Sequence, residues 1–124
     1  VAQCVDAADD PPTSAKQQET IARVKSFMDD HYADDFSLAD LARRAHLSPY
    51  HFLRIFTACT GIPPHLYQQQ VRIRQAKSKL LQGASLSETA VETGFGDQSH
   101  FSNVFKKMVG ITPGEYVKSA GYGR

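Results

Sequence analysis

Residues 37–67 read SLADLARRAHLSPYHFLRIFTACTGIPPHLY, and residues 85–116 read SLSETAVETGFGDQSHFSNVFKKMVGITPGEY. The second stretch repeats the first, at an offset of 48 from Ser37 to Ser85 and of 49 from His51 to His100. Ten of roughly thirty aligned positions are identical, which chance rarely yields. The identical pairs are Ser37/Ser85, Leu38/Leu86, Ala42/Ala90, His51/His100, Phe52/Phe101, Phe56/Phe105, Gly61/Gly110, Ile62/Ile111, Pro64/Pro113 and Tyr67/Tyr116.

Each copy has the pattern of a short helix, a tight turn and a longer helix. A serine followed three residues later by an acidic residue predicts the start of the short helix, at Ser37 and again at Ser85. Ser48 and Asp97 are the expected N-caps of the longer helices, which Gly61 and Gly110 end. This order is typical of a helix-turn-helix unit. Such units often bind DNA with their second helix. The alternative is a helical protein in which the same packing is duplicated and no DNA is bound.

The remaining segments also indicate helices. Ile21, Val24 and Phe27 or Met28 have helical spacing, and a long apolar-periodic segment begins at Pro63 and Pro64. We therefore predict an all-α fold of about seven helices, with two tandem helix-turn-helix subdomains joined by a long linker helix. The expected divisions are a flexible acidic tail at 1–18, a first subdomain at 19–62, the linker helix at 63–83, a second subdomain at 84–120 and a tail at 121–124.

The charge is distributed unevenly along the chain. The formal net charge is +1, but residues 1–20 carry four acidic side chains against Lys16, a net of −3. From Arg43 onward eleven Lys or Arg oppose four acidic residues, a net of +7. A basic body with an acidic tail favours a polyanionic partner.

The two copies resemble the DNA-binding domain of the AraC/XylS family of bacterial transcription regulators. The resemblance covers about residues 21–119. It is carried by SLADLA at 37–42, LSPYHFLRIF at 47–56 and GIPP at 61–64, and by Ala90, GFGDQSHF at 94–101, FKK at 105–107 and GITPGEY at 110–116. It implies sequence-specific binding of double-stranded DNA for transcription regulation, with recognition helices at about 49–60 and 97–109. The linker helix would be roughly 27 Å long, comparable with one turn of B-DNA, so both helices could enter successive major grooves.

The apolar stripes of the two longer helices predict which side chains face outward. Arg54 has the geometry to pair with guanine O6 and N7, and Gln98 and Asn103 suit adenine. Arg54 could instead contact phosphate or solvent, Leu53 could equally pack, and Asn103 stands where some relatives have Arg. The expected base-reading residues are Pro49, Tyr50, Leu53, Arg54, Gln98, Ser99, Ser102 and Asn103.

A second set is expected to contact phosphate. For the two histidines in it, packing and capping beside the core Phe is the alternative. The set is Arg43, Arg44, His51, Thr57, Arg72, Lys77, His100, Lys106 and Lys107; Arg74 and Lys79 could bind phosphate or pair within the molecule.

The sequence does not indicate an enzyme or a membrane protein. The five histidines are scattered, no Gly-x-Ser-x-Gly or Walker loop occurs, and Cys4 and Cys59 lack a nearby catalytic base. We expect no enzyme activity, cofactor or metal. No apolar run is long enough to span a bilayer and no signal peptide is evident, so a cytoplasmic protein with reduced thiols is expected.

Double-stranded DNA is the expected partner. A helical protein-interaction or dimerisation module is the alternative, and salt separates the two because phosphate contacts release counterions. The family resemblance implies possible contact with RNA polymerase. The acidic, proline-containing tail favours an upstream effector-binding and dimerisation domain outside this chain.

Overall fold

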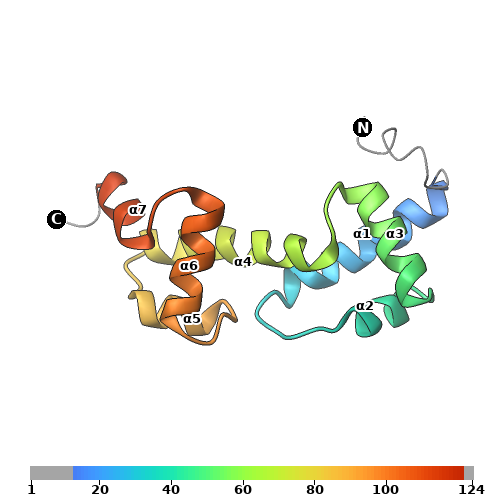
Figure 1. Cartoon of the computed structure of the whole chain (residues 1–124), viewed down its shortest axis with the longest axis horizontal. Helices are drawn as coiled ribbons and strands as arrows, with labels where there is room; N and C mark the ends of the chain where they lie inside the picture. Colours follow the sequence, from blue (N-terminus) through green and yellow to red (C-terminus); the bar gives the residue numbers. More distant parts are fainter. Residues whose placement is uncertain (1–12, 122–124) are drawn as a thin grey trace. The chain divides into compact units, whose positions relative to one another are not determined.

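The computed structural model describes residues 13–121, which contain seven α-helices and no strand (Figure 1). This confirms the all-α fold predicted from the sequence. The helices are α1 (Ala15–Asp30), α2 (Leu38–Arg44), α3 (Pro49–Thr60), α4 (Pro64–Leu81), α5 (Leu86–Glu92), α6 (Gln98–Val109) and α7 (Pro113–Ser119). Cys4 and most of the expected acidic tail lie outside the described residues.

The chain divides into two compact units. The first contains the described residues up to His31 together with Asp35–Gln68, and the second contains Tyr32–Asp34 and the chain from Gln69 onward. Helix α4 therefore contributes its first residues to one unit and the rest to the other. The sequence predicts that residues 63–83 form a linker helix separate from both subdomains. The observed division differs from that expectation, because α4 is shared between the two units.

The start of α1 corrects the predicted tail at 1–18. Ser14 is the N-cap: its side chain accepts a hydrogen bond from the backbone N–H of Gln17 at 3.1 Å, and the Gln17 side chain accepts one from the backbone of Ser14 at 3.0 Å. This reciprocal pair satisfies two of the backbone donors that a helix start leaves open. The helix thus begins at Ala15, inside the segment predicted to be flexible.

The first unit buries one apolar face of each of its first three helices. Ile21, Val24 and Met28 of α1 meet a stripe from α3 in which Phe52 and Phe56 are fully buried. Burying a side chain of this size contributes roughly 1.5–3 kcal/mol. Cys59 is half-buried at the edge of this core.

The second unit repeats this core. Ile73, Ala76 and Leu80 of α4 occupy the place of the α1 stripe, and Phe101 and Phe105 of α6 are fully buried. Val104 and Met108 are half-buried at the margin of this core. The spacing of three and four residues in α4 matches that of Ile21, Val24 and Met28 in α1, so the structural repeat also includes the preceding helix.

A chain of three aromatic rings follows the same path in both units. The centroids of Phe52 and Phe56 are 5.6 Å apart and those of Phe56 and Tyr67 are 5.8 Å apart. In the second unit the corresponding distances, from Phe101 through Phe105 to Tyr116, are 5.7 and 5.6 Å. These edge-on or tilted contacts are the favoured geometry for aromatic pairs. They join the longer helix of each unit to the helix that follows it.

The segment Tyr32–Asp34 packs within the second unit. The guanidinium of Arg72 donates to the carbonyl oxygen of Tyr32 at 2.7 Å and to that of Asp34 at 3.0 Å. Gly94 has φ +91°, and a Cβ at this position would lie 2.6 Å from the carbonyl oxygen of Ala33. Glycine is therefore required at 94 for two reasons, its backbone conformation and the close approach of another backbone.

We expect Gly94→Ala to destabilise the second unit more than Gly96→Ala, measured as the free energy of unfolding in urea. Gly96 has φ +89° but open space where its Cβ would lie. Its substitution should cost only the conformational strain, about 1–2 kcal/mol. Gly94→Ala should cost about 1–3 kcal/mol more, because backbone atoms must move. Equal losses in the two variants would show that the contact with Ala33 carries no energy.

Candidate nucleic-acid interface

Helix α3 is held in place by its ends and by its buried stripe. The Ser48 side chain accepts a hydrogen bond from the backbone N–H of His51 at 3.2 Å, and Pro49 occupies the first turn. Gly61 ends the helix in the left-handed conformation, with φ 91°. Because Phe52 and Phe56 are buried, the opposite face of the helix is fixed toward the surface.

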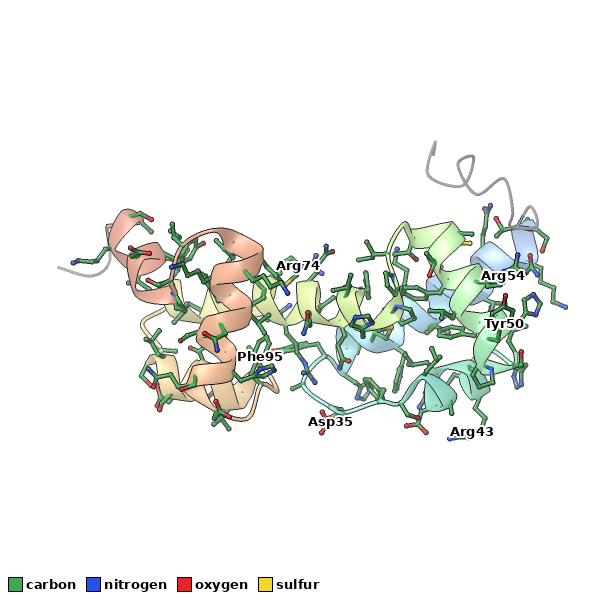
Figure 2. The ribbon with its side chains drawn as sticks, in the orientation of Figure 1. Asp35, Arg43, Tyr50, Arg54, Arg74 and Phe95 are labelled. Carbon is green, nitrogen blue, oxygen red and sulfur yellow. The ribbon has the colours of Figure 1, made fainter. Side chains whose placement is uncertain are left out.

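The first turns of α3 present an exposed surface. Tyr50 is 70% exposed, and Pro49 and His51 are exposed beside it. Arg54 lies one turn further, with its guanidinium carbon 5.7 Å from the Tyr50 ring centroid (Figure 2). An exposed large aromatic next to a guanidinium offers a flat apolar surface and a fork of hydrogen-bond donors on one helix face.

Leu53 and Thr57 differ from the exposed residues Pro49, Tyr50 and His51, and Arg54 is half-buried like them. Leu53 and Thr57 line a cavity together with side chains from α2 and from the start of α4. The structure thus gives Leu53 a packing environment, which the sequence left open as the alternative to base contact.

Helix α6 exposes a more polar face. Its N-cap Asp97 accepts a hydrogen bond from the backbone N–H of His100 at 2.8 Å. Gln98, Ser99 and Asn103 are exposed, and Ser102 is partly buried. The ring of His100 is itself exposed but lies edge-on to Phe95 at 5.7 Å, as expected if it packs beside the core.

The cations of α2 take part in local contacts. Arg43 pairs with Asp40 at 2.6 Å, and its side chain is 73% exposed. Hydrogen bonds from Ser37, first from its backbone and then from its hydroxyl, hold the pKa of Asp40 below its usual value, and the charge of Arg43 adds to this. The guanidinium of Arg44 lies 3.5 Å from the centroid of Phe27, which is cation–π geometry.

Arg72, one of the residues predicted to contact phosphate, has partners inside the second unit. Its Nε and one Nη donate to backbone carbonyl oxygens of the Tyr32–Asp34 segment, and its guanidinium lies 5.7 Å from the Phe95 ring centroid. These contacts use two of the five N–H donors of the guanidinium, so phosphate contact by Arg72 stays a prediction. Sequence patterns gave no signal for these contacts, since the acceptors are main-chain atoms.

Two lysines of α4 also have partners inside the second unit. Lys77 lies over the ring of Tyr116 at 5.8 Å, as Lys25 lies over Tyr67 at 5.3 Å in the first unit. Lys79 pairs with Glu92 at 3.2 Å. Arg74, Lys106 and Lys107 are exposed.

Comparison with known proteins agrees with this geometry. The family described as a helix-turn-helix domain matches residues 41–119. The uncharacterized HTH-type transcriptional regulator YbfI of Bacillus subtilis is 43% identical over 82 residues, which are 66% of this chain and 30% of YbfI. The bifunctional transcriptional activator and DNA repair enzyme AdaA of Bacillus subtilis is 32% identical over 108 residues, which are 85% of this chain and 51% of AdaA.

A solved structure shows the same fold in contact with DNA. The DNA-binding domain of AdpA, a global transcriptional factor, crystallised in complex with a target DNA, has a TM-score of 0.76 and 28% identity. The match covers 85% of this chain and 96% of that domain. Fold and similarity together define a tandem helix-turn-helix domain of the DNA-binding class. The chain belongs to the AraC/XylS family of transcription regulators, as its repeated motifs suggested.

The two curated relatives are longer than this chain, which spans 30% of one and 51% of the other. Across residues 13–121, no helix combines the length and the apolar composition that crossing a bilayer requires.

We expect Arg72→Ala to lower the free energy of unfolding by about 2 kcal/mol, because two carbonyl oxygens lose a charged donor. Arg74→Ala, an exposed cation two residues along the same helix, should change it by about 0.5 kcal/mol or less. Urea denaturation of both variants provides the comparison. If Arg72→Ala left stability unchanged and weakened DNA binding instead, the structural role assigned to Arg72 would be wrong.

Proposed function

We propose that this chain binds double-stranded DNA sequence-specifically through the outward faces of α3 and α6. The proposal rests on the equivalent construction of α3 and α6 in the two units. Each helix follows a short helix and a tight turn, buries a pair of phenylalanines on one side, and exposes the opposite side of its first turns. This is the arrangement in which the second helix of a helix-turn-helix unit enters the major groove.

On α3 we assign base reading to Pro49, Tyr50, Leu53 and Arg54. Arg54 is the central reader, because a guanidinium can donate two hydrogen bonds to the O6 and N7 atoms of one guanine. The exposed ring of Tyr50 supplies apolar contact to a thymine methyl group or a sugar.

On α6 the assigned readers are Gln98, Ser99, Ser102 and Asn103. The side-chain amides of Gln98 and Asn103 can each pair with the N6 and N7 atoms of adenine. Both are exposed on the face opposite Phe101 and Phe105. This polar face predicts a different preferred sequence from that of α3.

Phosphate contacts would position both units without specifying sequence. The residues that we assign to this role are Arg43, Arg44, His51, Thr57, Arg72, Lys77, His100, Lys106 and Lys107, with Arg74 as an additional exposed cation. The pair Lys106 and Lys107 lies in the last turns of α6, where cations also favour the helix dipole.

One chain would contact two successive major grooves. Helix α4 has 18 residues, which corresponds to roughly 27 Å at 1.5 Å per residue. A turn of B-DNA is roughly 34 Å, so the covalent connection is of the right length for two adjacent half-sites.

In the cell, this domain would act in transcription regulation as part of a longer, cytoplasmic regulator. The greater length of the relatives supports an effector-binding and dimerisation domain upstream. The family resemblance implies a contact with RNA polymerase. We assign the domain no catalytic role and no cofactor.

Arg54→Ala should lower affinity for the preferred duplex by about 1–3 kcal/mol and relax the preference at one base position. Lys107→Ala is the matched control, because losing a phosphate contact should weaken binding to all sequences alike. Fluorescence anisotropy with preferred and random duplexes measures both. Equal losses on the two duplexes for Arg54→Ala would exclude a base-reading role.

Selection of bound sequences from random duplex DNA, at two salt concentrations, tests the function as a whole. Enrichment of two short boxes about one helical turn apart is the expected result, with retention falling steeply as salt rises. A single enriched box would show that one unit alone specifies sequence. Absence of enrichment with salt-insensitive retention would favour a protein-interaction module instead.

A further inference from the structure

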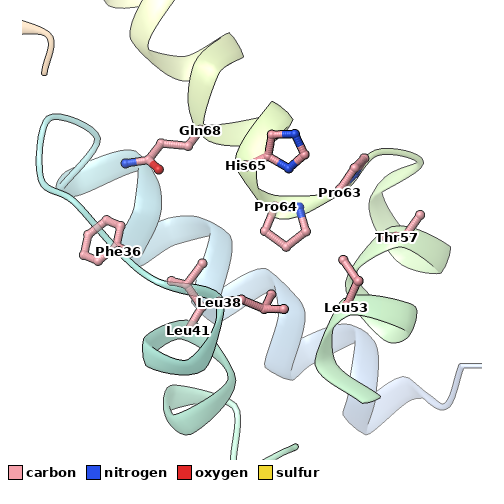
Figure 3. A pocket seen from close by; sticks show the side chains of 9 residues that line it. All are labelled: Phe36, Leu38, Leu41, Leu53, Thr57, Pro63, Pro64, His65 and Gln68. Atoms are coloured by element: carbon pink, nitrogen blue, oxygen red, sulfur yellow. The ribbon is translucent and has the colours of Figure 1, made fainter. Parts of the chain in front are cut away.

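The first unit contains a cavity of about 480 Å³ on one side of α3 (Figure 3). It is formed by the segment leading into α2, by α2 itself, by α3 and by the start of α4. Most of its lining is apolar, contributed by Phe36, Leu38, Leu41, Leu53, Pro63 and Pro64. A cavity of this volume and composition falls in the range of small-molecule sites.

The second unit provides an internal comparison, because it has a cavity at the equivalent place. That cavity is smaller, about 330 Å³. Its lining includes Ala84, Leu86, Gly114 and Val117. In the repeat these correspond to Phe36, Leu38, His65 and Gln68, which line the first cavity. The two cavities share these four positions, but Leu53 and Thr57 of α3 line the first, whereas no residue of α6 lines the second.

Three residues of α2 and α3 that line the first cavity have more polar counterparts in the second unit, and these counterparts do not line the second cavity. At the positions of Leu53 and Thr57 in α3, the second copy has Ser102 and Lys106 in α6. At the position of Leu41 it has Thr89. The first copy is thus more apolar along this wall, and none of its nine lining residues is Lys, Arg, Asp or Glu.

Three polar side chains interrupt the apolar lining. Thr57 of α3 and His65 and Gln68 of α4 line the same cavity. They supply a hydroxyl, an imidazole and an amide, which can donate or accept hydrogen bonds without a fixed charge. Apolar walls with a few polar groups are what a ligand site uses for affinity and orientation respectively.

We propose that this cavity binds a small aromatic molecule of two or three rings that carries one hydrogen-bonding group. The rings would lie against Leu38, Leu41 and Leu53. The hydrogen-bonding group would face Thr57, His65 and Gln68.

Occupation of the cavity would weaken DNA binding by the first unit, and this second step rests on the proposed function. Leu53 and Thr57 line the cavity and also belong to the DNA-contacting set of α3. A molecule held against them competes with the base and phosphate contacts assigned to them. By thermodynamic linkage, DNA bound at the first unit must weaken the ligand by the same factor.

The first experiment uses 1-anilinonaphthalene-8-sulfonate, an aromatic probe with one anionic group whose fluorescence rises when it leaves water. We expect saturable binding of one probe per chain. Leu38→Trp, which places an indole in the cavity, should weaken it by about tenfold or more. Leu86→Trp is the matched control at the equivalent position of the second unit, and it should leave probe affinity unchanged.

Chemical-shift mapping of the wild-type chain makes the test independent of how the variants fold. Shifts induced by the probe should centre on the residues that line the cavity, including Leu53, Thr57 and Gln68. Shifts centred elsewhere, no saturable binding, or equal binding by folded Leu38→Trp would overturn the proposed site.

The coupling between probe binding and DNA binding is then tested with two duplexes, one that carries the DNA sequence preferred by the first unit and one that carries the sequence preferred by the second. The expected result is that only the first-unit box reduces probe affinity. If the probe binds and neither duplex binds the protein, the proposed function fails while the ligand site stands. If both duplexes bind and probe affinity is unchanged, the ligand site stands and the competition is wrong.

Discussion

The contact of two phenylalanines with a tyrosine decides the architecture of each unit. Phe52 and Phe56 fix the rotation of α3 about its axis, because their burial leaves only one face of the helix open. Tyr67 of α4 packs edge-on against Phe56. The same three rings recur in the second unit with centroid distances within a few tenths of an ångström. The outward residues of both recognition helices depend on this contact more than on any polar interaction of their own.

Much of this could be predicted from the sequence because the signals are local. N-caps such as Ser48 and Asp97, the glycines that end α3 and α6, and the spacing of buried phenylalanines all act within a few residues. The start of α1 was missed because its capping box uses Gln17, a weaker signal than Glu, in a segment of low hydrophobicity. Which residues touch DNA stays a prediction.

Non-local contacts could not be predicted. Arg72 looks like any other cation of a basic helix, yet its acceptors are carbonyl oxygens about forty residues earlier in the chain. The cavity beside α3 requires Phe36, Leu53 and Pro64 to lie close together. The periodicity of a single helix does not predict such a contact between distant residues. The pairing of Lys79 with Glu92 is of the same kind.

The separation of buried and exposed positions on α3 and α6 has an evolutionary consequence. Every residue pair that forms the ring chains is identical between the copies, whereas Tyr50 and Arg54 face outward where the second copy has Ser99 and Asn103. After duplication, each copy could therefore acquire a new target by exchanging a few surface side chains, with no compensating change inside. Replacing the outward residues of one helix with those of the other should therefore transfer the DNA sequence that the donor helix prefers.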